Sequence, residues 1–160
     1  ETLIAKQDSS AHHFEHSLET QLPFLQYFKD KFKIVPICIK RLKLSSCKSL
    51  SEGIVRAITQ LDKPVLLVAS SDMTHYEPHD IATIKDRMAI TCIENRDPHG
   101  LIETVQSEKI TMCGVNPVTV MLLCSEKLGA KEAQLVKYMT SGEVSGDMEK
   151  VVGYAGMIIK

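Results

Sequence analysis

The sequence has no excess of either charge, no long apolar run and no leader-like segment. Its 19 basic and 20 acidic side chains give a formal net charge of −1. Because non-specific nucleic-acid binding needs a surplus of Lys and Arg to neutralise phosphates, that class of function is not expected. No run reaches the roughly 18 apolar residues of a membrane helix, and nothing resembles a signal peptide. We therefore expect a cytoplasmic protein that binds neither nucleic acid nor a membrane.

Paired cysteines are missing as well. The five cysteines have no C-x-x-C spacing and their number is odd, so neither a closed disulfide framework nor a zinc finger is indicated. Reduced thiols fit a cytoplasmic setting best. Cys38, Cys92 and Cys124 lie in apolar patterns and are expected to be packing residues.

The chain length predicts one domain over residues 1–160, because a chain of this size buries about 70% of the surface that its unfolded form exposes. The chain opens on Glu1 rather than Met, and its last residues form an apolar run typical of an interior strand. We therefore expect the sequence to be a piece of a longer domain.

The hydrophobic pattern alternates between helical and extended segments. Apolar residues at helical spacing predict helices, and short apolar or alternating runs predict strands. The expected helices are 17–32, 48–61, 80–95, a shorter piece around 100–105, and 116–128. The expected strands are 33–40, 64–70, 133–140 and 151–160.

The fold class follows from the strand at 64–70. Residues 65–69 are apolar on both faces, which is typical of a parallel strand covered by helices on each side of its sheet. The last two strands are joined by a loop rich in turn formers and are expected to be antiparallel neighbours. The prediction is an α/β fold with a mixed, largely parallel sheet flanked by helices.

The segment 70–76 carries the first candidate site, since it follows the predicted buried strand directly. Ligands of open α/β sheets bind at the carboxyl ends of the strands. Asp72 and His75 place a carboxylate and an imidazole three residues apart, which suits general base catalysis or metal ligation. Alternatively, Asp72 caps the next turn and His75 packs in a polar pocket.

Two further segments carry candidate residues. His16 lies between two carboxylates at the start of an apolar stripe, where it could share a helix face with another histidine and bind a metal. Cys113 lies in a loop before a helix, where the helix dipole would stabilise its thiolate. The alternative for Cys113 is a small buried residue beside a tight glycine turn.

Together these segments resemble the Memo family, whose bacterial and archaeal members are called AmmeMemoRadiSam system protein B. The family is similar in fold to class III extradiol ring-cleavage dioxygenases. Four motifs carry the resemblance in order over nearly the whole chain: residues 15–25 (EHSLETQLPFL), 70–76 (SSDMTHY), 112–117 with Met-Cys-Gly and Pro117, and 140–155, which includes TSGEVSGD and VVGYA.

The resemblance implies a cleft in which His75 and Cys113 meet two further histidines around a metal ion. The dioxygenases hold Fe(II) with two histidines and a carboxylate, and in the Memo pattern a cysteine replaces the carboxylate, which is Cys113 here. Iron or copper is the implied cofactor. His75 would be both ligand and base, and Asp72 would orient it. Further cleft candidates are Glu15, His16, Ser71, Tyr76 and Gly114.

One departure from the family bears on completeness. The other two site histidines belong to H-A-G-Y and N-H-x-G motifs upstream of the E-H-S motif, and this sequence contains neither. The chain is therefore expected to be the carboxyl-terminal part of the family domain. We expect an exposed sheet edge or apolar face where the amino-terminal part would pack, covered in this chain by a second copy.

Two functions of different classes fit the resemblance. The first is a metal-dependent redox or dioxygenase-like protein with an unidentified substrate. The second is a binding module that uses the same cleft to hold a phosphorylated peptide or another protein, since a fold does not fix a function.

Overall fold

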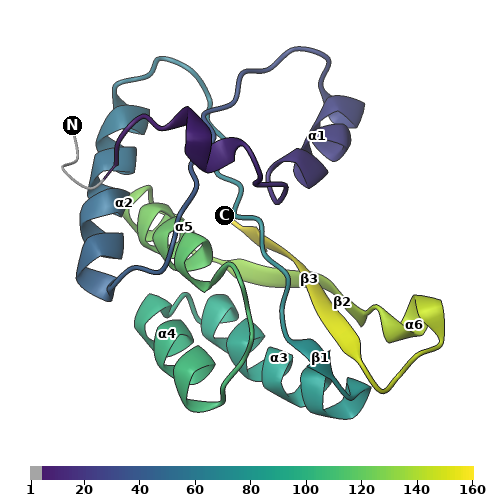
Figure 1. The fold of residues 1–160 in the computed structure, drawn as a ribbon. Coiled ribbons are helices and arrows are strands. Elements are labelled where there is room, and N and C mark those ends of the chain that lie inside the picture. The colour runs from purple at the N-terminus through teal and green to yellow at the C-terminus, as the bar shows by residue number, and fades with distance from the viewer. Residues whose placement is uncertain (1–4) are drawn as a thin grey trace.

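The computed structural model describes residues 5–160, which form helices and one small sheet (Figure 1). The α-helices are α1 (Leu22–Phe28), α2 (Leu44–Thr59), α3 (His79–Glu94), α4 (Pro98–Ser107), α5 (Val115–Lys127) and α6 (Gly142–Ser145). Short 3-10 helices cover Ser9–His12 and Glu19–Gln21. The strands are β1 (His75–Glu77), β2 (Ala133–Thr140) and β3 (Val151–Ile159).

The sheet within the described residues has the order β1-β3-β2, and both of its pairings are antiparallel. The predicted antiparallel pairing of the last two strands is confirmed, with Tyr138 opposite Ala155 and Thr140 opposite Gly153. The structure is thus mixed α/β, as predicted, but its sheet is antiparallel rather than largely parallel.

The predicted strands 33–40 and 64–70 account for this difference. Both segments lack strand structure and run as plain trace in Figure 1, the second leading directly into β1. No backbone hydrogen bond joins residues 33–40 or 64–69 to another segment within the described part of the chain. A strand needs a hydrogen-bonded neighbour, and residues 5–160 supply none for these two segments.

The predicted helices are confirmed with shifted ends that local sequence explains. The helix expected at 17–32 shortens to α1, which has Pro23 in its first turn, where the missing N–H costs nothing. In α4, the carboxylate of Asp97 accepts a hydrogen bond from the N–H of Gly100 at 2.8 Å. This cap starts the helix at Pro98, earlier than the apolar pattern indicates.

Two apolar clusters form the core and share α5. The first joins α3, α4 and α5 to the sheet, with Ile90, Leu101 and Leu122 fully or almost fully buried. The second joins α2 to the other side of α5 through residues such as Cys47 and Leu123. Because α5 is covered on both sides, it fixes the loop at its amino end, where Cys113 lies.

Burial differs sharply along the chain. None of residues 5–46 or 61–72 is buried, whereas the structure buries side chains throughout α3, α4 and α5. The predicted packing role is confirmed for Cys124, which is buried, while Cys38 and Cys92 are half-buried. Among residues 5–160, no helix is both long enough and apolar enough to span a membrane.

Candidate functional site

The segment 70–76 is held against β3 by backbone hydrogen bonds. The N–H of Met73 donates to the carbonyl of Gly153, and the N–H of Gly153 donates to the carbonyl of Thr74, both at 2.9 Å. His75 then begins β1 opposite Val152. The segment therefore leads into an antiparallel strand, and the predicted position at the end of a parallel strand is not what the structure contains.

Three predicted site residues converge on one oxygen atom. The thiol of Cys113 donates to Oδ1 of Asp72 at 2.7 Å, and Nε2 of His75 lies 2.9 Å from the same oxygen. The carboxylate and the imidazole are each partly exposed to solvent. Residues 41 positions apart thus form one group of a thiol, a carboxylate and an imidazole, which we call the Asp72 cluster.

Mutual hydrogen bonding within the cluster shifts two pKa values in opposite directions. Desolvation acts to raise the pKa of Asp72, but hydrogen bonds from Cys113 and His75 outweigh it and hold that pKa below its ordinary value. Desolvation of the sulfur and its bond to Asp72 raise the pKa of the Cys113 thiol. The carboxylate is therefore kept charged and the thiol is kept protonated.

Ser71 and Gly114 bring the two halves of the cluster together. Oγ of Ser71 accepts a hydrogen bond from the N–H of Gly114 at 2.9 Å and lies 3.9 Å from Sγ of Cys113. A Cβ at position 114 would overlap the Ser71 side chain and the carbonyl of Ser70. Only glycine permits this close approach, which explains sterically why the motif has Gly after Met-Cys.

The backbone around His75 is irregular in a way that aims the imidazole. Tyr76 has a φ of 58°, in the left-handed region that disfavours a bulky side chain, and the β1–β3 register shifts between His75 and Glu77. Such bulges redirect side chains beside functional sites. The N–H of His75 donates to Oγ1 of Thr111 at 2.6 Å, whereas the Tyr76 side chain is itself 76% exposed.

The buried carboxylate of Asp86 holds the backbone of the segment that carries Asp72 and His75. Asp86 of α3 is fully buried and accepts hydrogen bonds from the N–H of Thr74 at 2.9 Å and from the hydroxyl of Tyr138 at 2.8 Å. Burial and this bond raise the pKa of Tyr138. Thr74 lies between Asp72 and His75, so Asp86 fixes the backbone that carries both.

Sequence reasoning missed Thr111 and Asp86. Thr111 stands just before the Met-Cys-Gly motif, but a threonine there carries no signal of its own. Asp86 could have been found, because it shares a helical spacing with the buried residues Ala82, Ala89 and Ile93. A charged residue on an apolar stripe predicts a buried, hydrogen-bonded carboxylate.

The E-H-S motif contacts Ser70 of the site loop through one backbone carbonyl and one side chain. Oγ of Ser70 donates to the carbonyl of Ser17 at 2.8 Å, and Nε2 of Gln21 donates to Oγ of Ser70 at 3.0 Å. The side chain of His16 instead pairs with Glu19 at 3.2 Å and is 75% exposed. The structure therefore places the motif beside the cluster but leaves the His16 imidazole outside it.

Glu15 bonds to residues near it rather than to the Asp72 cluster. Its carboxylate accepts a hydrogen bond from the N–H of Ser17 at 2.7 Å, and the bonds with Ser17 lower its pKa. The thiol of Cys38 lies 3.9 Å from the other carboxylate oxygen. Glu15 thus stabilises the turn that presents Ser17 to the site loop.

A hollow of about 430 Å³ opens beside Cys113. Apolar residues such as Val105 and Met112 line the hollow, and so do the cations Lys40 and Arg41. A small molecule or a peptide side chain with an anionic group would find complementary charge there. Cys113 is the member of the Asp72 cluster that lines this hollow, so a ligand bound there would lie beside the thiol.

The structure brings together only part of a metal-ligand set. Within residues 5–160, no three His, Cys, Asp or Glu side chains are arranged to hold a metal ion together. The thiol, imidazole and carboxylate of the Asp72 cluster are nevertheless donor types that transition metals accept. The cluster fits a metal in its chemistry but not in the number and placement of its ligands.

Comparisons with known proteins agree with the motif pattern. The family model described as Memo-like protein matches residues 1–158. The chain is 43% identical over 158 residues to a MEMO1 family protein of Methanopyrus kandleri, which covers 98% of this chain and 56% of the relative.

A MEMO1 family protein of Ignicoccus hospitalis is 46% identical over 155 residues, covering 96% of this chain and 54% of that relative. One from Saccharolobus solfataricus is 44% identical over 156 residues, with 96% and 55% covered. The chain thus spans about half the length of the curated relatives it matches. Since the family model covers nearly the whole chain, the protein belongs to the Memo-like family.

Proposed function

We propose that this protein is a metal-binding redox protein of dioxygenase-like architecture, in which Cys113 and His75 are ligands and Asp72 orients the imidazole. The observation that supports this most strongly is the meeting of all three side chains on Oδ1 of Asp72. Clusters of titratable groups next to a hollow are typical of functional sites.

The donor types favour iron or copper. A thiolate together with imidazole suits a soft or redox-active ion, while the carboxylate extends the choice towards iron. Metal binding would replace the thiol proton that Cys113 now donates to Asp72. A bound iron or copper ion would supply one-electron chemistry and would polarise a substrate.

The chain's own residues would position the imidazole for the metal. Asp72 accepts the hydrogen bond from Nε2 of His75, which favours the tautomer with an unprotonated Nδ1. Nδ1 is then the nitrogen that would bind the metal, while Asp72 holds the N–H on the other side of the ring. The lowered pKa of Asp72 keeps its negative charge available to hold that N–H.

The remaining ligands would come from polypeptide equivalent to the part of the relatives that lies outside the matched region. The resemblance implies two further histidines in that part, together with the strands that would make the sheet largely parallel. The present chain would then bind metal weakly by itself, through two ligands and water, and a full-length relative would bind it tightly.

Cobalt(II) titration tests the proposal, because a cysteine thiolate bound to Co²⁺ gives a charge-transfer band in the near ultraviolet. We expect a saturable band in the native chain and its loss in Cys113→Ser, with Cys38→Ser as the matched control that keeps it. Elemental analysis of the Methanopyrus kandleri relative should find iron or copper. A metal-free relative, or a band unaffected by Cys113→Ser, would exclude the proposal.

One observation favours the second candidate function, a module that binds phosphorylated peptides. Lys40 and Arg41 line the hollow beside Cys113, and paired cations bind phosphate well. Titration with a phosphotyrosine peptide tests this function, with His75→Ala and Arg41→Ala as variants and the unphosphorylated peptide as control. Saturable binding of the phosphorylated peptide alone, lost in Arg41→Ala, would favour the module.

A further inference from the structure

The hollow beside Cys113 is lined by residues of both core clusters. Val105 and Met112 belong to the cluster of α3, α4, α5 and the sheet, whereas Ile39 and Leu42 pack on the cluster of α2 and α5. These four side chains are buried or half-buried. The hollow, of about 430 Å³, is therefore a recess with an apolar lining and has the size of a small-molecule site.

The charge of this hollow has one sign. Lys40 and Arg41 line it and are exposed, and no Asp or Glu is among its lining residues. The ion pairs formed within residues 5–160 include neither of these cations. Both positive charges are therefore available to a ligand, and the guanidinium of Arg41 can hold a carboxylate or a phosphate through two parallel hydrogen bonds.

The segment that carries the two cations is fixed to α5. Asn116, in the first turn of that helix, is 6% exposed. Its Oδ1 accepts a hydrogen bond from the N–H of Leu42, and its Nδ2 donates to the carbonyl of Leu42, both at 3.2 Å. Because Leu42 directly follows Arg41, this double contact holds the backbone of the cations at the hollow. Such prior ordering lowers the entropic cost of binding a ligand.

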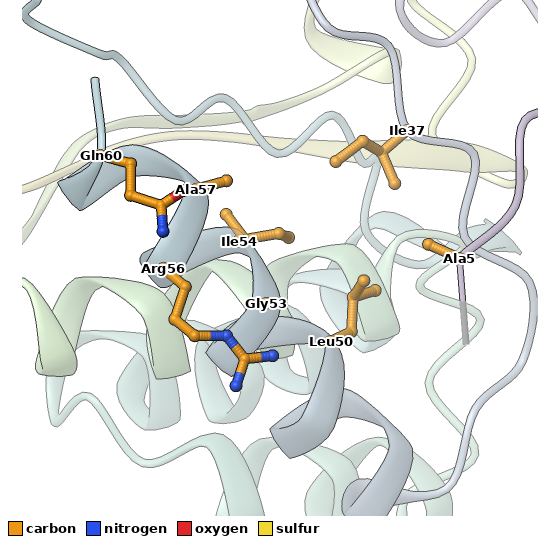
Figure 2. Close-up of a pocket in the computed structure, with 8 residues that line it drawn as sticks. All are labelled: Ala5, Ile37, Leu50, Gly53, Ile54, Arg56, Ala57 and Gln60. Atoms are coloured by element: carbon orange, nitrogen blue, oxygen red, sulfur yellow. The ribbon is translucent and has the colours of Figure 1, made fainter. Parts of the chain in front are cut away.

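A second hollow, of about 330 Å³, lacks this combination. It is lined by apolar side chains that include Ile37 and Leu50, and Figure 2 shows Arg56 of α2 among them. It shares no lining residue with the hollow beside Cys113 and has neither a cysteine nor a second cation in its lining. Of these two hollows, only the one beside Cys113 joins paired positive charge to a thiol.

The lining beside Cys113 suits a small organic acid better than a peptide. The amide of Asn116 is already bonded to Leu42, and Gln106 is the other amide side chain in the lining. A peptide would bring several backbone N–H and C=O groups, each of which needs a partner when it is buried. A compact molecule with an apolar body and one anionic group needs only the apolar lining and the cations.

We propose that the hollow beside Cys113 binds a small organic acid, whose apolar body packs among residues such as Val105 and Met112 and whose anionic group pairs with Lys40 and Arg41. This acid is the class of substrate on which the metal site would act, and in that respect the inference rests on the proposed function. Arg41 selects the ligand, because a neutral molecule of the same shape leaves its charge unpaired.

Protection of the Cys113 thiol from alkylation tests the proposal. Iodoacetamide is added at one fixed pH with rising concentrations of phenylacetate, phenyl phosphate or the neutral phenylacetamide, and site-resolved mass spectrometry follows each cysteine. We expect saturable protection of Cys113 by at least one of the two anions and none by phenylacetamide at the same concentrations. The two anions distinguish a carboxylate ligand from a phosphate. Cys38, which does not line the hollow, should react at an unchanged rate.

Two matched variants assign the effect to the cations. Arg41→Gln removes the charge from the hollow and should raise the concentration for half-protection by about tenfold, because a charge-assisted hydrogen bond is lost. Arg56→Gln makes the same exchange at the second hollow and should leave protection unchanged. Both arginines are exposed, so neither substitution should alter unfolding by urea.

Equal protection by phenylacetamide, or equal protection of the two variants, would overturn the proposal. Protection by a phosphotyrosine peptide without protection by either small anion would also overturn it and would favour the peptide module. The Co²⁺ band of Cys113 reports on the metal separately. A chain protected by the anions but without that band would retain the acid-binding hollow and lose the metal function, and the reverse result would leave the metal function alone.

Discussion

The two ends of this chain use apolar residues in opposite ways. Most of the buried apolar side chains belong to residues 73–159, where they lie between α3, α4, α5 and the sheet, whereas none of residues 5–46 is buried. Both regions contain comparable apolar runs, so hydrophobicity does not separate them. The carboxyl-terminal region supplies most of the core, to which α2 adds by packing on α5, whereas residues 5–46 contribute only partly buried side chains.

Secondary structure explains why the difference falls where it does. A helix forms its backbone hydrogen bonds within one segment, but a strand depends on another segment. The strands β2 and β3 are joined by a short connection and pair with each other. Residues 33–40 and 64–69 have no such neighbour among the described residues.

The largest effect on the free energy of unfolding is expected from truncating a buried side chain, and truncating an exposed one provides the matched comparison. Leu122→Ala removes a side chain that is 2% exposed and should lower the free energy of unfolding by about 2–5 kcal/mol. Val35→Ala changes an 84% exposed side chain and should cost less than about 0.5 kcal/mol. Urea denaturation measures both, and equal costs would break the comparison.

The second-largest effect on stability is expected at one of two glycines in β3, and the other glycine serves as its control. A Cβ at Gly153 would overlap the buried carboxylate of Asp86, while at Gly156 the nearest atom would be 4.0 Å away. Gly153→Ala should therefore destabilise the protein by about 1–3 kcal/mol, and Gly156→Ala should be tolerated. Thermal unfolding measures both variants. If Gly156→Ala lowers stability as much as Gly153→Ala does, the close packing of Gly153 on Asp86 is not the cause.

The next prediction concerns the pH dependence of Cys113 alkylation. The Asp72 carboxylate contributes to the raised pKa of this thiol, so Asp72→Asn should bring its reaction with iodoacetamide to lower pH. Desolvation of the sulfur remains in the variant and keeps the midpoint above that of a free thiol.

Site-resolved mass spectrometry across a pH series measures this profile. Glu15→Gln, which changes a carboxylate near Cys38 rather than Cys113, should leave the Cys113 profile unchanged. An unshifted profile in Asp72→Asn would show that the bond to Cys113 does not form.

The smallest effect is expected at His16. Its pair with Glu19 is exposed on both sides, and such pairs contribute about 0–1 kcal/mol. His16→Ala should therefore change neither unfolding nor the Co²⁺ band of Cys113 noticeably. Loss of that band would place His16 in the metal site. The site would then include a side chain from residues 5–46.

The helices and the last two strands could be predicted because their signals are local. Apolar spacing predicted α2, α3 and α5, and turn formers between β2 and β3 indicated their pairing. Asp72 and His75 could be predicted from the segment that follows an apolar run, but their meeting with Cys113 came from motif resemblance, since no local rule relates residues 41 positions apart. The roles of Thr111 and Asp86 depend on tertiary packing, which the pattern of a single helix or loop does not specify.

The unpaired state of residues 33–40 and 64–69 could not be predicted for a different reason. Their composition predicts strands whatever surrounds them, and pairing depends on segments elsewhere. The apolar face that the sequence predicted is present in the structure as the exposed side chains of these two segments. What covers that face stays a prediction.

Hydrogen exchange on the isolated chain tests the central comparison most directly. The sequence predicts four strands, and of these four segments the structure pairs only the last two, which are β2 and β3. The account predicts that amides of β2 and β3 in the shared pairing exchange slowly, while those of 33–40 and 64–69 exchange almost as fast as an unfolded peptide. Equal protection of all four segments in the monomeric chain would contradict it.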